Sequence, residues 1–418
     1  MGLLEALDLH KNVQSGKDEK YSEVEYRLYS WGEICSPFIG DREHSVWARH
    51  ILADFPFKLF SSSNPYDVLP QKLCLTFKAP YEMKINKERV KLSGIFSHEI
   101  AKEFAAFLSL VTRRRVLVGK QLRYDGLPIE EEVDQYERSH FQERQRLKEL
   151  EPKKIYQLLD NLQSMDRYIA NGYILALRLY HLAIEMAYTE PEFSYLLLVT
   201  CLEAVSSAIF KEYTPENKEK YLDSTFPGWT QIYDFSSVEQ KQALKDLLLR
   251  KKDGFVFQKL RKFVTENVPE RFFSDKFDDS KPDYLVGAVG DKRTMKEFAK
   301  EYGCEYSIET DLGETDGHKY IIRSPMIITE MEKIEKDCLK QRLRDIYEAR
   351  SQLIHAGVRL PRSIVFGLFR GLPAEAEVEM VNSTKQKHVL KIPPLITLER
   401  LVSYSMVEFL CRQYTKNL

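Results

Sequence analysis

One arginine interrupts the apolar face of a predicted helix near the carboxyl end of this chain. Leu343, Ile346, Leu353 and Ile354 recur at steps of three and four residues, the period of an amphipathic helix, and Arg350 falls inside that stripe. A buried arginine without an anionic partner is strongly disfavoured. The helix that carries Arg350 therefore has to pack against an element that supplies an acid.

An earlier helix, expected from Phe193 to about Lys211, carries the opposite charge in a similar setting. Glu203 shares a register with Leu196, Val199 and Phe210. A hydroxyl such as that of Ser206 can share a hydrogen bond with a carboxylate but does not neutralise its charge. The simplest solution is that Glu203 and Arg350 meet, directly or through one water.

Composition limits the class of protein. The chain has 418 residues, 43% of them hydrophobic and 30% charged, which is enough for two or three domains with a sizeable core. The formal net charge is −1, so any nucleic-acid surface must be a local patch. The six cysteines show no paired spacing, which favours a reducing compartment and argues against a structural zinc site.

The chain shows no signal peptide and no predicted membrane span. The longest apolar stretch, Ser194 to Phe210, is interrupted by Glu203 and is shorter than a span. We expect a cytoplasmic protein with no membrane partner. There is no Gly-rich phosphate loop and no Gly-x-Ser-x-Gly elbow, so no cofactor is predicted.

The patterns divide the chain into a β-rich first part and a helical second part. Residues 1 to about 125 are predicted as one α+β domain, and residues 126–152 as a charged linker or exposed helix. Residues 153–418 are predicted to be mainly helical, with an irregular insertion at about 213–325.

Several local signals place element boundaries. We expect a helix capped by Ser97 and ending at Arg113-Arg114-Arg115, where cations suit the helix dipole. The other expected boundaries are capping boxes at Thr189/Glu192 and Ser236/Glu239, a hairpin within 306–322, the Arg350 helix from about Ile327 to Gly357, paired strands at 378–380 and 389–392, and a terminal helix capped by Thr397.

Histidine 355 makes the Arg350 helix a candidate active site. His355 follows Arg350 by five residues, Ser351 lies one helical turn before His355, and histidine is the side chain best suited to proton transfer near neutral pH. An arginine and a histidine at one helix end suit phosphate chemistry. The alternative is a solvated histidine at a helix terminus and an arginine paired with a structural acid.

Two other groups of residues bear on function. Aromatic residues alternate with a basic cluster in the insertion, which favours either nucleic-acid contact or a solvated face over aromatic core residues. The cluster comprises Arg250, Lys251, Lys252, Lys259, Arg261 and Lys262. His44 and His50 lie near Asp41 and Glu43, but their spacing suits no usual metal site.

Four helices with Arg-x-x-x-x-His at the end of the third resemble the layout of the HEPN superfamily, the higher eukaryotes and prokaryotes nucleotide-binding domains. The resemblance extends over about residues 153–418 and is closest to the ApeA-like branch. It rests on Leu177-Arg178-Leu179-Tyr180, on Tyr195 to Val199 through Leu202-Glu203-Ala204, and on Arg350 to His355 followed by Ala356-Gly357. Ser351 departs mildly from the asparagine often found after the arginine.

This resemblance implies a multidomain α+β protein whose second part is a HEPN four-helix bundle with an insertion. It implies a metal-independent endoribonuclease, part of a toxin or antiviral defence system against phage, with its active site formed across a homodimer. Arg350 would bind phosphate, His355 would transfer protons, Ser351 would position the histidine or substrate, and Glu203 would hold Arg350.

The N-terminal domain would then sense a phage-derived or cellular trigger or recruit RNA. A non-catalytic HEPN module that dimerises and binds a nucleotide or partner is the alternative. A metal-dependent enzyme is a third class, for which the chain lacks ligands.

Overall fold

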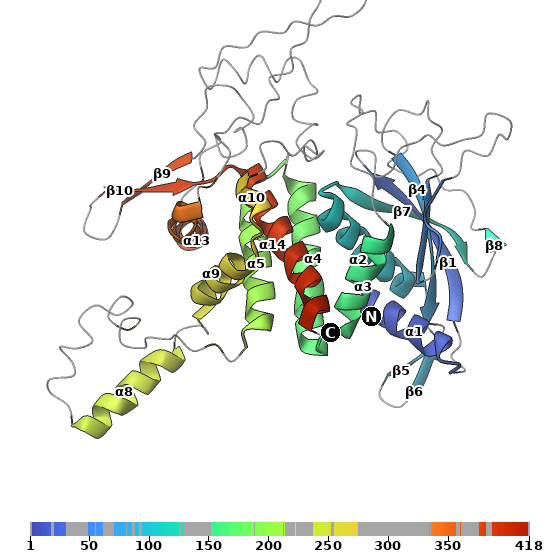
Figure 1. The fold of residues 1–418 in the computed structure, drawn as a ribbon, viewed down its shortest axis with the longest axis horizontal. Coiled ribbons are helices and arrows are strands. Elements are labelled where there is room, and N and C mark those ends of the chain that lie inside the picture. The colour runs from blue at the N-terminus through green and yellow to red at the C-terminus, as the bar shows by residue number, and fades with distance from the viewer. Residues whose placement is uncertain are drawn as a thin grey trace, which may run out of the picture.

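The computed structural model has the mixed helix and sheet composition expected of an α+β protein (Figure 1). It describes residues 2–17, 21–30, 49–54, 56–61, 71–80, 82–85, 88–91, 94–124, 127–128, 152–187, 189–211, 213, 222, 237–251, 255–274, 334, 336–356, 360, 376–381 and 387–416. Of the predicted elements, the hairpin within 306–322 and nearly all of the 126–152 linker lie outside these residues.

An antiparallel sheet forms one side of the molecule. Its strand order is β2-β3-β4-β1-β7-β8. The strands are β1 Tyr21–Ser30, β2 Arg49–Leu52, β3 Phe57–Ser61, β4 Gln71–Pro80, β7 Val116–Tyr124 and β8 Leu127–Pro128, with a separate hairpin of β5 Glu82–Ile85 and β6 Glu88–Lys91. Along β1, Val24, Tyr26 and Leu28 are buried on one face, the period of two expected of a half-buried strand.

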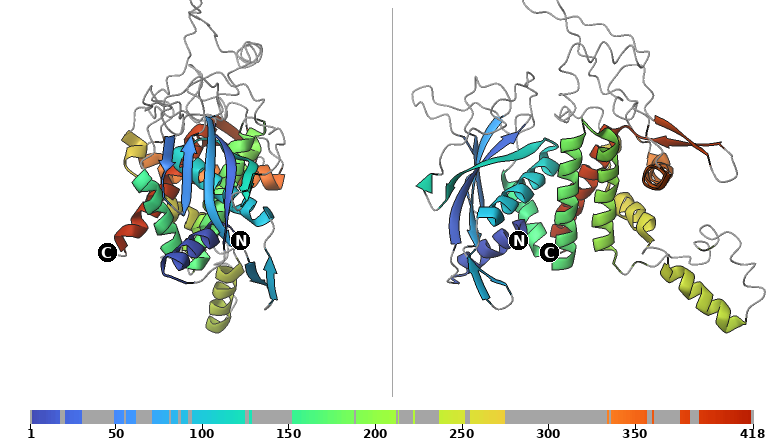
Figure 2. Two further views of the ribbon diagram at one scale, coloured as in Figure 1. Left: turned by 90° about the vertical axis from the view of Figure 1, so that its right-hand side faces the viewer. Right: turned by 180° about the vertical axis from the view of Figure 1, so that it is seen from behind.

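Two helices cover the inner face of this sheet. Helix α1, Leu3–Gln14, packs on β4, and α2, Gly94–Thr112, packs on β7, β4 and β1 (Figures 1 and 2). The sequence patterns did not predict α1. Its first N–H, from Leu3, donates to Glu103 Oε2 at 2.6 Å, and a Cβ on Gly2 would lie 2.0 Å from the same oxygen. A larger residue at position 2 would therefore require the Glu103 carboxylate to move.

The other described helices follow along the chain. They are α3 Pro152–Ser164, α4 Arg167–Met186, α5 Pro191–Ile209, α8 Val238–Lys251, α9 Val256–Asn267, α10 Arg271–Ser274, α13 Leu339–Ala356 and α14 Leu395–Lys416. Of these, α8 extends away from the rest (Figure 1). Strands β9 Ala376–Val381 and β10 Lys387–Ile392 pair antiparallel, which confirms the predicted pairing of 378–380 with 389–392. Helix α4 lies between α2 and α5, so the order across the molecule is the sheet, then α2, then α4, then α5 (Figure 2).

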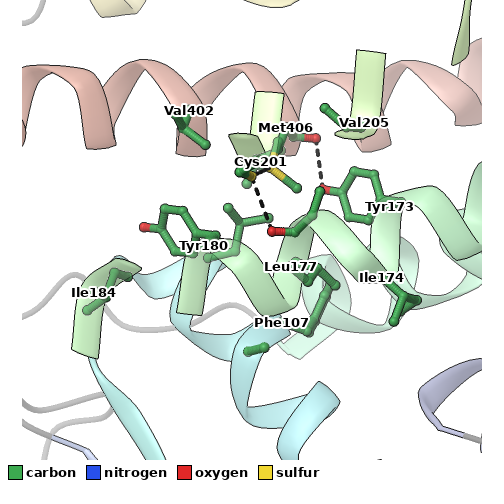
Figure 3. Packing of buried hydrophobic residues seen from close by; sticks show 14 of the residues in the cluster. Phe107, Tyr173, Ile174, Leu177, Tyr180, Ile184, Cys201, Val205, Val402 and Met406 are labelled. Carbon is green, nitrogen blue, oxygen red and sulfur yellow. Dashed lines mark hydrogen bonds between the residues drawn. The ribbon is translucent and has the colours of Figure 1, made fainter. Parts of the chain in front are cut away.

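Helices α4 and α5 form the closest helix pair in this part of the chain. A Cβ on Gly172 would lie 2.2 Å from Cβ of Ala208, so a glycine permits their approach. Cys201 donates to the carbonyl of Ala176 at 3.2 Å and contacts Met406 of α14 (Figure 3). The buried apolar residues of the sheet half and the helical half form one continuous core.

A buried ion pair joins the end of α2 to α14. Arg113 Nη2 lies 2.6 Å from Glu399 Oε2, and Arg113 Nε donates to both carboxylate oxygens at 3.0 Å. The hydroxyl of Tyr180 on α4 donates to Glu399 Oε1 at 2.5 Å. Arg113 has a left-handed backbone, with φ of 54°. Helix α2 ends at Thr112, directly before the three arginines as predicted, but Arg113 and Arg114 are buried inside the protein, which the sequence pattern did not indicate.

The predicted helix caps were displaced by a few residues. Helix α2 begins at Gly94, and the Ser97 hydroxyl lies inside the helix, 2.8 Å from the Tyr26 hydroxyl. At α5 the N-cap is Glu190 without a side-chain bond, so Thr189 does not form a capping box. Pro191 follows at the first helical position, where its missing N–H and fixed φ favour a helix start.

Three further helix starts differ from the sequence prediction. The capping box of α8 uses Ser237 and Gln240 in place of Ser236 and Glu239. Helix α14 begins at Leu395, so Thr397 lies in its first turn and is not the cap. The apolar spacing predicted that the Arg350 helix starts near Ile327. In the structure α13 begins at Leu339, directly after a 3₁₀ turn at Lys336–Cys338.

Part of the predicted insertion belongs to the core. Helix α9 packs against α5, α13 and α14, and its Leu260, Phe263 and Val264 are buried. Within the insertion predicted at about 213–325, α9 is therefore a regular helix that packs on the helical half of the protein. The apolar face explains this outcome, since burying such side chains stabilises the fold by about 1.5–3 kcal/mol each.

Helix α5 contains the apolar stretch that the sequence analysis considered as a membrane span. The helix begins at Pro191, three residues before the predicted stretch. Among the described residues it is the one helix long and apolar enough to cross a membrane, and half of its apolar window is buried inside the protein.

The Arg113–Glu399 pair generates a stability prediction. Replacing Arg113 with Met leaves Glu399 buried without its partner, so we expect the free energy of unfolding to fall by about 3–5 kcal/mol. The double variant Arg113→Met/Glu399→Leu should recover much of that loss. Urea unfolding monitored by circular dichroism measures both.

Lys336→Ala is the matched control, because it breaks the exposed Lys336–Glu270 pair, 2.6 Å long. Its expected cost is below about 1 kcal/mol. If Arg113→Met costs no more than Lys336→Ala, the buried pair does not hold the two halves together.

Candidate functional site

Glu203 and Arg350 meet where α13 packs on α5. Arg350 Nη2 donates to Glu203 Oε2 at 2.9 Å, across 147 residues of sequence. Both side chains are mostly buried, with 20% of Arg350 and 11% of Glu203 exposed. This contact confirms the prediction that the two opposite charges on apolar helix faces lie together.

The pair is only partly satisfied by hydrogen bonds. Glu203 Oε1 and Arg350 Nε are buried and have no hydrogen-bond partner within the described structure. Burial raises the pKa of Glu203 above its usual value, and the charge and hydrogen bond of Arg350 oppose that rise without cancelling it. The carboxylate is therefore held ionised mainly by one arginine.

A row of aromatic and cationic side chains extends from this pair toward α9. The Arg350 guanidinium carbon lies 5.8 Å from the ring centre of Tyr347, one turn earlier on α13. Tyr347 contacts Phe257 of α9 with ring centres 5.1 Å apart, and the Arg261 guanidinium carbon lies 5.8 Å from the Phe257 ring. We call Arg350, Tyr347, Phe257 and Arg261 the α9–α13 ladder.

His355 lies at the exposed end of α13. With about 100° of rotation per residue, it points about 140° away from Arg350 around the helix axis. Among the described residues it makes no hydrogen bond or ion pair. One chain therefore does not bring Arg350 and His355 to a common point, although both belong to the last two turns of α13.

Ser351 and two apolar residues belong to the last two turns of α13. Ser351 is half-buried and shows no side-chain hydrogen bond within the described part of the chain. Leu353 packs partly against the core, whereas Ile354 is 43% exposed. Ile354 therefore does not continue the buried stripe of Leu343 and Ile346.

The basic cluster predicted in the insertion is not one surface. Lys259 is buried, whereas Arg261 and Lys262 are on the outside of α9. Lys262 lies 3.8 Å from Glu266 and over the rings of Phe210 and Tyr213. The side chains of Arg250, Lys251 and Lys252 lie outside the described residues.

The described residues hold no group of three or more His, Cys, Asp or Glu side chains that suits a metal ion. Cys74, Cys201, Cys338 and Cys411 form no disulfide within the described residues. His44, Asp41 and Glu43 lie outside the described part, and so does the side chain of His50.

The sequence patterns missed the roles of Tyr347 and Phe257. Tyr347 precedes Arg350 by three residues, a spacing that places two side chains on one helix face. Phe257 is one of the aromatic residues that alternate with the basic cluster, for which both nucleic-acid contact and a place in the core were considered, and its ring is half-buried beside Arg261. An aromatic residue three positions from a buried arginine is a usable signal for such a ladder.

The raised pKa of Glu203 leads to a prediction about pH. Ionisation of Glu203 is disfavoured in the folded protein, so relative to Glu203→Gln the parent should lose stability as pH rises from about 4.5 through the folded pKa. Below pH 4.5 the difference should level off. Urea unfolding of both proteins from pH 4 to 8 measures it.

Arg350→Met sharpens this test. Loss of the opposing positive charge should raise the folded pKa of Glu203 further, extending the upper end of the window to higher pH, and should cost about 1–3 kcal/mol at neutral pH. Arg344→Met, an exposed arginine on the same helix, is the control. A window that stays in place after Arg350→Met contradicts electrostatic coupling of the pair.

Comparison with known proteins adds no assignment, since no family model, no curated protein and no solved structure matches this chain.

Proposed function

We propose that this protein is a metal-independent endoribonuclease of the HEPN type, an effector of a toxin or antiviral defence system. The observation that carries the proposal is the Arg350–Glu203 pair, which fixes an arginine on α13 five residues before an exposed histidine. The supporting sequence pattern is Arg-x-x-x-x-His at the end of this helix. In this proposal residues 153–418 form the HEPN bundle, and the N-terminal α+β part senses a trigger or recruits RNA.

The proposed reaction uses the RNA's own 2′-hydroxyl. Its oxygen attacks the adjacent phosphorus while a neutral His355 imidazole accepts the hydroxyl proton. The bond from phosphorus to the 5′-oxygen breaks, and an imidazolium donates a proton to that oxygen. The products are a 2′,3′-cyclic phosphate and a 5′-hydroxyl, and no metal enters the balance.

Arg350 would stabilise the charge that develops on the phosphoryl oxygens. Its Nη2 donates to Glu203 and its Nε is buried, which leaves Nη1, a nitrogen without a hydrogen-bond partner in the described structure, to face the phosphate. A guanidinium remains charged at all physiological pH values and presents a planar fork to phosphate. Glu203 would hold that fork in one orientation, and Ser351 would position the histidine or substrate.

A homodimer would supply the second proton-transfer group. One imidazole cannot readily act on both sides of an in-line displacement, so a two-fold axis near residues 350–355 would bring in a second His355. The exposed Ile354 beside His355 offers apolar surface for such pairing. The 140° between Arg350 and His355 on one helix is consistent with a site assembled from two chains.

A non-catalytic HEPN module is the second candidate. If the chains do not pair, two observations favour this second candidate. Arg350 and His355 point about 140° apart on the helix, and Glu203 neutralises the charge of Arg350. In that case α13 would serve dimerisation or binding of a nucleotide or a partner protein without cleavage. The two candidates differ in the products that they leave from RNA.

The proposal predicts cleavage in the absence of metal. Purified protein incubated with total RNA and excess chelator should yield 2′,3′-cyclic phosphate ends, and His355→Ala should lower the rate by about 100- to 10,000-fold. Arg344→Ala, exposed on the same helix, should cleave like the parent. Strict dependence on a divalent metal, or equal cutting of DNA, contradicts the mechanism.

The dimer predicts a non-linear response to inactive subunits. When parent protein is mixed with an excess of His355→Ala chains, mixed dimers carry an incomplete site, so activity should fall below the parent fraction. Arg344→Ala chains in the same proportion provide the control. A monomer by light scattering that cleaves at full rate contradicts the shared site.

A further inference from the structure

The α9–α13 ladder places two guanidinium groups on an aromatic support. Arg350 lies over Tyr347, and Arg261 lies over Phe257, while the two rings contact each other between them. Tyr347 and Phe257 are half-buried, so each ring is anchored in the fold on one side. The ladder connects the candidate site on α13 to the outer surface of α9.

The two arginines of the ladder differ in whether an acid is paired with them. Arg350 is paired with Glu203, whereas Arg261 is exposed and forms no ion pair among the described residues. Lys262, the next residue, lies 3.8 Å from Glu266, a long and exposed pair. Within the described part of the chain, the positive charge of Arg261 at the outer end of the ladder is therefore not paired with an acid.

This combination suits a nucleic acid better than a protein partner. Exposed guanidinium groups bind phosphate oxygens, and aromatic rings and guanidinium planes both stack on bases. The rings are 5.1 Å apart, too close to admit a base, which needs about 3.4 Å on each side. A base would therefore stack on the outer guanidinium plane or on the exposed part of a ring.

We propose that the α9–α13 ladder binds an unpaired stretch of RNA beside Arg350 and leads it across α9. The inference rests on the proposed ribonuclease function and assigns substrate positioning to Tyr347, Phe257 and Arg261. The occupant is single-stranded because stacking on these groups requires bases that are not engaged in a helix. Paired RNA presents phosphates but no free base faces.

Binding is tested apart from cleavage. Full-length His355→Ala protein is titrated into a fluorescent single-stranded RNA of twelve nucleotides and into its duplex, with anisotropy recorded at several salt concentrations. The single strand should bind more tightly than the duplex. Duplex RNA that binds equally well overturns the proposal.

Single substitutions then separate the charge from the rings. Arg261→Gln should reduce the slope of log affinity against log salt by about 0.7, the loss of one phosphate contact on a single strand. Phe257→Leu and Tyr347→Leu should each weaken single-strand binding by about 5- to 150-fold. Tyr347→Phe should restore the affinity, because it keeps the ring.

Lys336→Gln is the control for removal of a positive charge, since Lys336 is exposed on the 3₁₀ turn before α13 and paired with Glu270. It should leave the salt slope unchanged. An Arg261→Gln slope equal to that of Lys336→Gln overturns the inference, even if the parent protein cleaves RNA. Binding that follows these expectations in a parent protein that does not cleave RNA supports the ladder and rejects the ribonuclease.

Discussion

A fully buried ion pair between Arg113 and Glu399 sets the arrangement of this molecule. It joins the last turn of α2, which covers the sheet, to the start of α14, which runs through the helical half, and Tyr180 of α4 completes it with a hydroxyl. Two charges removed from water repay their desolvation only when distances and hydrogen bonds are good. The sheet and the helices are therefore constrained to one relative position, and the shared apolar core fills the space around it.

The second ion pair, between Glu203 and Arg350, works under the same constraint but is less complete. One oxygen and one nitrogen of the pair are buried without hydrogen-bond partners in the described structure. Burial and the single arginine act in opposite directions on the carboxylate, which leaves the pKa of Glu203 raised. Such a pair fixes α13 on α5, with Nε of Arg350 enclosed and 20% of the arginine side chain exposed.

The degree to which the sequence predicted this structure depended on the range of the signal. A charge on an apolar helix face is visible within two turns, and for this reason the contact between Glu203 and Arg350 could be inferred across 147 residues. The helical periodicity after Lys153 and the pairing of β9 with β10 were equally local. The β-rich start was also recognisable, but α1 was not among the predicted elements.

The remaining features depend on contacts that no local pattern records. Arg113 stands in a run of three arginines that suited an exposed helix end, and its partner Glu399 lies 286 residues away. Helix α9 buries Leu260, Phe263 and Val264 against α5, α13 and α14, partners that its own sequence does not specify. The ladder needed Phe257 and Tyr347 from two separate helices, and the caps of α5 and α14 were decided by neighbouring prolines.

The Glu203–Arg350 contact also restricts the order in which descendants of this chain can change. If the arginine is lost first, the carboxylate can take up a proton, and its raised pKa already favours that form. If the glutamate is lost first, the guanidinium cannot give up its charge at any physiological pH. Sequence changes that remove this pair should therefore pass through chains that keep Glu203 and lack Arg350, and rarely through chains that keep Arg350 and lack Glu203.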